Sequence, residues 1–97
     1  MSSSYLIEYR PEVHNDLDEI PKNIQTRIKR AIEQRLETSP DRYGERLRRS
    51  LLGLWKLRVG DYRVVYEIKG HKVTIWIIGN RKEVYGDIQK RWASHKQ

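Results

Sequence analysis

The chain has 97 residues, no cysteine, 20 lysines and arginines against 13 aspartates and glutamates, and a formal net charge of +7. This length suits a single domain over residues 1–97, and the absence of cysteine excludes disulfides, thiolate metal sites and cysteine catalysis. His14, His71 and His95 lack metal-ligand spacing, so we expect no metal and no cofactor. The N-terminus does not resemble a signal peptide, and the longest apolar run is too short to span a bilayer, so we expect a cytoplasmic protein.

The charge is unevenly distributed along the chain. Residues 1–41 carry six basic and eight acidic side chains, a net of −2, whereas residues 42–97 carry 14 and five, a net of +9. This asymmetry predicts a polyanionic partner, either nucleic acid or an acidic protein. No segment combines a basic face with a strongly apolar one, so we expect no membrane partner.

The first 40 residues predict a strand followed by two helices. Ser4 to Arg10 alternates in the manner of a strand, and Pro11 suits the first position of a helix. A second helix is expected from Pro21 to about Thr38. The apolar positions of the two helices are Val13, Leu17 and Ile20, then Ile24, Ile28, Ala31, Ile32 and Leu36. This spacing predicts a helical hairpin that covers a sheet.

Three carboxylates, Asp16, Asp18 and Glu19, lie close together in the first predicted helix. They could form a catalytic cluster, but such runs are usually the solvated face of a helix, and we interpret them so. The next segment, Asp41 to Ser50, is a polar connection rich in arginine. It is either a rim that grips phosphate or a solvated linker, and the sequence leaves both interpretations open.

The segment from Gly53 to Tyr85 predicts an antiparallel three-strand meander with turns at Gly60-Asp61 and Gly70-His71. Across the first turn the expected pairs are Val59 with Tyr62, Arg58 with Arg63, Leu57 with Val64, Lys56 with Val65 and Trp55 with Tyr66. One face of this hairpin is apolar and the other carries Lys56, Arg58 and Arg63. Facing like charges cost stability, which suggests an anionic ligand, unless the side chains simply splay into solvent.

Across the second turn the expected pairs are Tyr66 with Ile75, Val65 with Trp76, Val64 with Ile77 and Arg63 with Ile78. Val65, Trp76 and Ile78 would then form an apolar patch on the cationic face. Such a patch marks a partner surface unless the C-terminal segment covers it. Asp87 to His95 is expected to form a short basic helix or a tail. The order β-α-α-β-β-β predicts an α+β fold: a twisted, mainly antiparallel four-stranded sheet with the helical hairpin on one face.

Three motifs in this order resemble a known group of proteins. They are D-L-x-x-I-P from Asp16, W-K-L-R-V-G-D-Y-R-V-V-Y-E-I from Trp55, and G-N-R-x-x-V-Y from Gly79. Over about residues 5–88 the chain resembles the RelE/ParE superfamily of bacterial and archaeal toxins, and within it the RelE-like ribonuclease branch. The resemblance implies a toxin of a type II toxin–antitoxin system that cuts mRNA in the ribosomal A site without a metal. Its implied partners are a cognate antitoxin, the ribosome and mRNA.

The resemblance also implies an active site. The family's catalytic positions fall on Lys56, Arg63, Arg81 and Tyr85. Arg58 matches a basic position that is frequent in the family. The remaining candidates for RNA binding are arginines of the polar connection: Arg46, Arg48 and Arg49. Two positions depart from the family pattern, because Leu54 replaces a second lysine of some members and Asn80 replaces a histidine of many.

The reaction of this family, attack of a ribose 2′-OH on the adjacent phosphate to leave a 2′,3′-cyclic phosphate, is compatible with these residues. It needs a proton acceptor and positive charge on the phosphate oxygens. Lysine is the candidate acceptor, because neighbouring arginines disfavour its charged form. Arg63 and Arg81 would clamp the phosphate, and Tyr85 would either stack on a base or pack on the sheet. Two other functions remain open: a ParE-like inhibitor of DNA gyrase, or a passive RNA- or ribosome-binding module.

Overall fold

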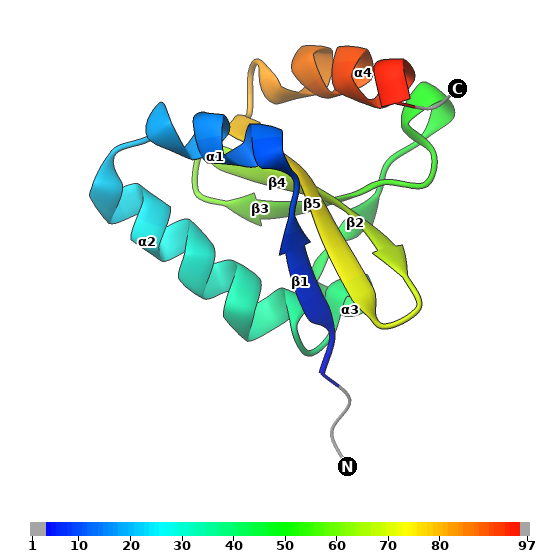
Figure 1. The fold of residues 1–97 in the computed structure, drawn as a ribbon, viewed down its shortest axis with the longest axis horizontal. Helices are drawn as coiled ribbons and strands as arrows, with labels where there is room; N and C mark the ends of the chain where they lie inside the picture. Colours follow the sequence, from blue (N-terminus) through cyan, green and yellow to red (C-terminus); the bar gives the residue numbers. More distant parts are fainter. Residues whose placement is uncertain (1–3, 96–97) are drawn as a thin grey trace.

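A five-stranded sheet lies between helices that cover its two faces, as Figure 1 shows. The computed structural model describes residues 4–95. The strands are β1 (Leu6–Tyr9), β2 (Glu45–Arg46), β3 (Trp55–Val59), β4 (Tyr62–Lys69) and β5 (Lys72–Asn80), in the spatial order β1-β5-β4-β3-β2. β1 pairs with β5 in parallel, and the other neighbours are antiparallel. The predicted α+β class and mainly antiparallel sheet are therefore confirmed, with one strand more than expected.

The additional strand is β2, which lies in the segment predicted as a polar connection. It follows a short helix, α3 (Pro40–Tyr43), and precedes a 3-10 turn, η2 (Arg49–Leu51). β2 pairs Glu45 with Lys56 and Arg46 with Trp55. Two residues are too few to show the alternation that indicates a strand in a sequence. The segment is therefore part of the sheet as well as a connection.

Tyr66 of β4 holds the chain in place just before β2. Its hydroxyl donates a 2.6 Å hydrogen bond to the carbonyl oxygen of Pro40. A Cβ at Gly44 would collide with this hydroxyl, so only glycine fits there. Burial, and secondly the carboxylate of Asp41, raise the pKa of Tyr66 above its ordinary value of 10.0. The phenol therefore stays protonated and remains a donor.

The helical hairpin covers one face of the sheet, as predicted. It consists of α1 (Pro11–Asp18), α2 (Lys22–Ala31) and a π-helical turn, η1 (Ile32–Leu36). Pro11 occupies the first helical position. The Gln25 side-chain amide donates to the carbonyl oxygens of Leu17 (2.7 Å) and Ile20 (2.8 Å), which satisfies carbonyl groups at the end of α1. The hairpin packs its apolar stripe on Leu57, Val59, Val64, Tyr66, Val73, Ile75 and Ile78 of the sheet.

The opposite face is partly covered by a fourth helix, α4 (Val84–His95), which begins three residues before the predicted Asp87. Trp92 of α4 meets Trp76 edge to face, with the ring centroids 4.9 Å apart. Val65, Trp76 and Ile78 are at most 2% exposed, so they form no exposed patch, and the alternative that the C-terminal segment covers this face is confirmed for Val65 and Trp76. The C-terminal segment supplies enough apolar side chains, Val84, Ile88 and Trp92, to bury this face. None of the described helices has the length and hydrophobicity to cross a membrane.

A β-bulge in β5 explains where the predicted pairing failed. All five pairs of the first hairpin are confirmed. In the second hairpin Tyr66 does pair with Ile75, but the register then shifts by one, so that Val65 pairs with Ile77 and Arg63 pairs with Gly79. An extra residue in one strand moves every later side chain to the other face. Ile78 consequently lies against the helical hairpin, and Trp76 and Ile77 both belong to the cluster under α4.

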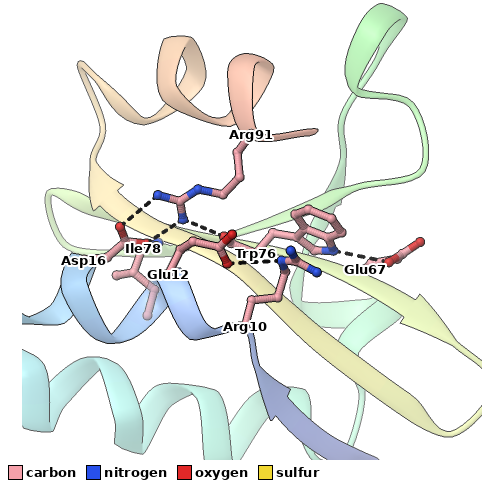
Figure 2. A network of polar contacts seen from close by, with 7 residues as sticks. All are labelled: Arg10, Glu12, Asp16, Glu67, Trp76, Ile78 and Arg91. Atoms are coloured by element: carbon pink, nitrogen blue, oxygen red, sulfur yellow. Dashed lines mark hydrogen bonds and ion pairs between the residues drawn. The ribbon is translucent and has the colours of Figure 1, made fainter. Parts of the chain in front are cut away.

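Asp16 links α1, β5 and α4, as Figure 2 shows. Its carboxylate accepts from both terminal nitrogens of Arg91, at 3.0 and 3.2 Å, and from the backbone N–H of Ile78 at 3.1 Å. Arg91 also donates to the carbonyl oxygen of Trp76 at 2.9 Å. The side chain of Asp16 is only 13% exposed. The interpretation of this carboxylate as part of a solvated face was wrong, because its partners lie 62 and 75 residues away in the sequence.

Candidate functional site

The candidate site is an open depression on the part of the sheet that α4 does not cover. It has a volume of about 240 Å³ and is lined by Tyr43, Glu45, Lys56, Arg58 and Arg63. Lys56 pairs with Val65 across β3 and β4, so it lies on the same face as the residues beneath α4. Arg58 and Arg63 alternate onto this face as well. The sheet therefore brings together three of the predicted site residues.

Lys56 is the residue with the most defined surroundings in this depression. Its Nζ lies 3.5 Å from Oε1 of Glu45 and 5.6 Å from the centroid of the Tyr85 ring. The side chain is one-third exposed, so it is accessible from solvent. Tyr85 belongs to the first turn of α4 and also packs against the apolar cluster under that helix. The packing of Tyr85 on the sheet, one of the two interpretations, is thus present in the structure, and its role in the site stays a prediction.

Glu45 is a site residue that the sequence analysis missed. It reaches Lys56 because β2 pairs it directly opposite on β3. No local signal indicates this contact, since the two residues are 11 positions apart and β2 is too short to recognise. The charged neighbours predicted for Lys56 were all cations. The structure adds one carboxylate to them.

Arg58 and Arg63 face each other across β3 and β4, as the sequence predicts. Nη1 of Arg63 donates 3.0 Å hydrogen bonds to the carbonyl oxygens of Gly60 and Tyr62. These bonds hold the guanidinium over its own hairpin turn. Arginine has five N–H donors, so the other nitrogens remain available to a phosphate. Arg58 is exposed beside it.

Arg81 follows β5 and is exposed. Its backbone N–H donates a 2.9 Å hydrogen bond to the carbonyl oxygen of Asp61, in the same turn that Arg63 contacts. Arg81 therefore lies at the hairpin end of the site, whereas Glu45 and Tyr85 adjoin Lys56. Of the predicted catalytic set, Lys56 and Arg63 line the depression and Tyr85 adjoins Lys56, whereas Arg81 does not line it.

The three arginines of the polar connection are placed differently from one another. Arg46 and Arg48 border a second open depression of about 470 Å³, which Lys56 also lines. The guanidinium carbon of Arg46 lies 5.3 Å from the centroid of the Trp55 ring. Arg49 borders neither depression. It lies in η2 with a φ of 58°, a left-handed conformation that is uncommon for a residue with a side chain.

The position of Leu54 accounts for one departure from the family pattern. Leu54 is fully buried in the cluster under α4, so a lysine there would not reach this depression without a change in packing. The accessible cations are Lys56 and the surrounding arginines. Such a set can bind a polyanion, stabilise charge on phosphate and, through lysine, move a proton. Within residues 4–95, no three histidine, aspartate or glutamate side chains are grouped to hold a metal ion.

Comparisons with known proteins agree with this architecture. The family model described as "ParE toxin of type II toxin-antitoxin system, parDE" matches residues 7–85. Toxin RelE of Mycobacterium tuberculosis is 39% identical over 72 residues, which cover 72% of this chain and 74% of that protein. Toxin RelG of the same organism is 29% identical over 83 residues, which cover 84% of this chain and 95% of that protein.

Solved structures give the same result. The M. tuberculosis toxin–antitoxin complex RelBE2 contains a chain with a TM-score of 0.77 and 29% identity, covering 84% of this chain and 95% of that one. The RelB–RelE antitoxin–toxin complex of Methanococcus jannaschii contains a chain with a TM-score of 0.65 and 23% identity, covering 82% of this chain and 96% of that one. The second likeness supports the fold alone. Both structures contain a toxin bound to its antitoxin.

Proposed function

The chain belongs to the ParE toxin family of type II toxin–antitoxin systems, within the RelE/ParE superfamily, and from this premise we propose that it is a ribosome-dependent mRNA endonuclease. One observation carries the proposal. Lys56 lies in an accessible depression, between an aromatic ring and two arginines that face each other. Cleavage of RNA by its own 2′-OH needs this combination of a proton-transferring group, fixed positive charge and a stacking surface.

In the proposed mechanism the 2′-oxygen attacks the adjacent phosphorus while its proton is removed. The bond to the 5′-oxygen then breaks, and that oxygen takes up a proton. Lys56 assists the first proton transfer. Arg63 and Arg81 stabilise the negative charge that builds up on the phosphate oxygens. Tyr85, whose ring adjoins Lys56, stacks on a base of the message.

The candidate site is too shallow to position RNA by itself, which is why a requirement for the ribosome is proposed. The depression around Lys56 is open and holds only about 240 Å³, so it cannot enclose a nucleotide and its neighbours. In-line attack requires the 2′-OH, the phosphorus and the leaving oxygen to be aligned. We therefore propose that the ribosome holds the message in the reactive geometry and that the toxin supplies charge and proton transfer.

The decisive experiment maps cleavage of a translated message with and without the protein, with the same message free of ribosomes as a parallel sample. We expect cuts with cyclic phosphate ends in the ribosome-bound sample and very slow cleavage of free RNA. Equal cleavage of both samples would remove the ribosome from the proposal. No cleavage in either would reject the enzyme.

A second candidate function is ParE-like inhibition of DNA gyrase without RNA chemistry. The observation that favours it is the family model itself, which is that of ParE toxins. The relatives called RelE and RelG favour the ribonuclease instead. A gyrase supercoiling assay run beside the cleavage map separates the two, because inhibition of supercoiling without RNA cuts would select the ParE-like activity.

A further inference from the structure

A further cationic depression, separate from the two described above, lies between the helical hairpin and the Gly60–Asp61 turn. It has a volume of about 200 Å³. It is lined by the side chains of Arg27, Arg30, Gln34, Arg35 and Arg58, over a floor of Ala31, Val59 and Gly60. We call these four arginines and Gln34 the α2 groove. Three of its arginines come from the half of the chain whose net charge is negative, so the distribution of charge along the sequence does not reveal it.

The groove is built by one row of side chains on α2 and on the η1 turn that continues it, and by the open edge of β3. Arg27, Arg30 and Gln34 are spaced three and four residues apart, which places them in one row on the helix surface. β2 pairs with β3 only at Trp55 and Lys56, so Arg58 and Val59 line the groove from an edge of β3 that no further strand covers.

The Gly60 turn closes one end of the groove. The Arg27 guanidinium lies over this turn, with a nitrogen 3.6 Å from the place where a Cβ of Gly60 would be. Gly60 has a φ of +60°, a conformation that glycine adopts readily. The Arg27 guanidinium thus lies within van der Waals reach of the Gly60 turn, and the positive φ, rather than a lack of room, favours glycine at this position.

The positive charge of this groove is not compensated within residues 4–95. None of the ion pairs formed by the described residues includes Arg27, Arg30, Arg35 or Arg58, and no carboxylate lines the depression. Four guanidinium groups around a floor of small residues repel one another, and an anion relieves that repulsion. Guanidinium groups match phosphate oxygens in geometry as well as charge.

Arg58 connects this groove to the candidate active site. It lines both the groove and the depression that contains Lys56. A strand whose reactive phosphate lies at Lys56 could therefore continue past Arg58 without leaving a cationic surface. A phosphodiester chain carries the regularly repeated charges that such a continuous path fits, whereas an acidic protein segment would need carboxylates spaced to match.

We propose that the α2 groove is a second RNA-backbone site, which binds phosphates flanking the one at Lys56 and extends the RNA footprint across β3 onto α2. The identity of the bound strand as the cleaved message rests on the proposed function. The binding of RNA backbone in the groove is independent of that function.

The test compares two double variants of one helix. Arg27→Gln with Arg30→Gln removes two groove charges, and Lys22→Gln with Lys29→Gln removes two charges from exposed positions of α2 outside the groove. Glutamine retains high helix propensity, and thermal melts followed by circular dichroism verify the fold of both variants. The probe is a fluorescent single-stranded RNA with 2′-O-methyl groups, which block cleavage. Its Kd is measured over a range of salt concentrations.

The groove variant should bind more weakly than the control variant, and the slope of log Kd against log salt should fall by about 1.4 units, which corresponds to two lost phosphate contacts. The control should keep the parent slope. Equal effects of the two variants would overturn the proposal, because only long-range charge would then be involved. Unchanged RNA binding together with weaker antitoxin binding by the groove variant would overturn it in favour of an acidic protein partner. If the parent protein cleaves no message, the proposed function fails while the difference in slope still reports on the groove.

Discussion

Lys56 is the residue on which the proposed chemistry depends most directly. Lys56→Met removes the amine from beside the Tyr85 ring and retains an unbranched side chain of similar length. We expect the single-turnover cleavage rate on saturating ribosomes to fall by about 10²-fold or more, in line with the loss of a group that transfers a proton. Arg81→Ala should have a similar effect, because its charge matters most in the transition state.

Arg48→Ala is the matched control for these two variants. Arg48 is exposed and borders the neighbouring depression rather than the one around Lys56 and Arg63. This change should weaken binding and reduce its salt dependence, with little effect on the rate once ribosomes are saturated. Parent rates for both Lys56→Met and Arg81→Ala would contradict the assignment of the site.

Glu45 forms an ion pair with Lys56 in the free toxin, with 3.5 Å between Oε1 of Glu45 and Nζ of Lys56. An incoming phosphate must compete with this carboxylate for the same ammonium group. Glu45→Gln should therefore tighten binding of uncleavable RNA a few-fold, roughly the effect of removing one exposed charge pair, and leave the saturated cleavage rate close to that of the parent. Titration of the RNA and single-turnover kinetics measure the two quantities separately. A large loss of rate in Glu45→Gln would show instead that the carboxylate itself takes the 2′-OH proton.

α4 is held against the sheet by apolar packing and by a polar contact with a distant part of the chain. Figure 2 shows Arg91 of α4 held by Asp16 of α1 and by the carbonyl oxygen of Trp76. Asp16→Asn retains the shape of the side chain and removes its charge, so we expect the free energy of unfolding to fall by about 2 kcal/mol. Chemical denaturation measures this change.

Asp18→Asn provides the control for this variant. Asp18 lies two residues further along the same helix and is exposed. It takes part in none of the ion pairs formed within residues 4–95. Its substitution should therefore leave stability nearly unchanged. If the two variants lost the same stability, the Asp16–Arg91 contact would not be the cause.

Tyr66, which anchors the segment around α3, should make the stability of the fold depend on pH in the alkaline range. Burial raises the pKa of Tyr66 above 10.0 in the folded protein. The folded state therefore favours the protonated phenol, and this contribution to stability is complete below pH 10 and lost as the pH rises above it. Tyr66→Phe should weaken the loss of stability above pH 10, which denaturation curves from pH 8 upwards would measure.

The same variant should cost about 1 kcal/mol near pH 7, because the carbonyl of Pro40 loses its donor. Tyr9, whose pKa is raised mainly by burial and then by Glu33 and Glu37, retains part of the alkaline effect. Tyr43→Phe at an exposed position is the control. An unchanged alkaline slope in Tyr66→Phe would show that the phenol does not link pH to folding.

The molecule as a whole carries a net charge of +7, and the similar M. tuberculosis structure RelBE2 is a complex of toxin with antitoxin. We expect the cognate antitoxin to approach through an acidic segment that is steered to the cationic surface around Lys56 and Arg58. Raising the salt concentration should slow association by one to two orders of magnitude, roughly the range known for electrostatic steering. Stopped-flow association kinetics measure this rate.

The dissociation rate should respond to salt much less than the association rate. An association rate that did not change with salt would exclude electrostatic steering. The apolar residues expected to add to this surface, Val65, Trp76 and Ile78, cannot do so in the described structure because they are buried. Charge alone is therefore expected to direct the antitoxin to this surface.

Much of the architecture followed from local patterns in the sequence. The two-residue turn at Gly60-Asp61 and the alternation on either side of it set the pairing of β3 with β4, and the helical periodicity gave the hairpin that covers them. These signals are readable because each arises from residues close together in the chain. The same register placed Lys56, Arg58 and Arg63 on one face.

The remaining features depend on contacts between distant segments. The bulge at Trp76 has no local signature, and it is accommodated because α4 buries both Trp76 and Ile77. Glu45 meets Lys56 through a strand of two residues, and Asp16 finds its partners on β5 and α4. The arginines of α2 reach Arg58 only because the hairpin packs across β3. Burial and strand pairing select such contacts among many that a linear pattern would allow, so they required the three-dimensional structure.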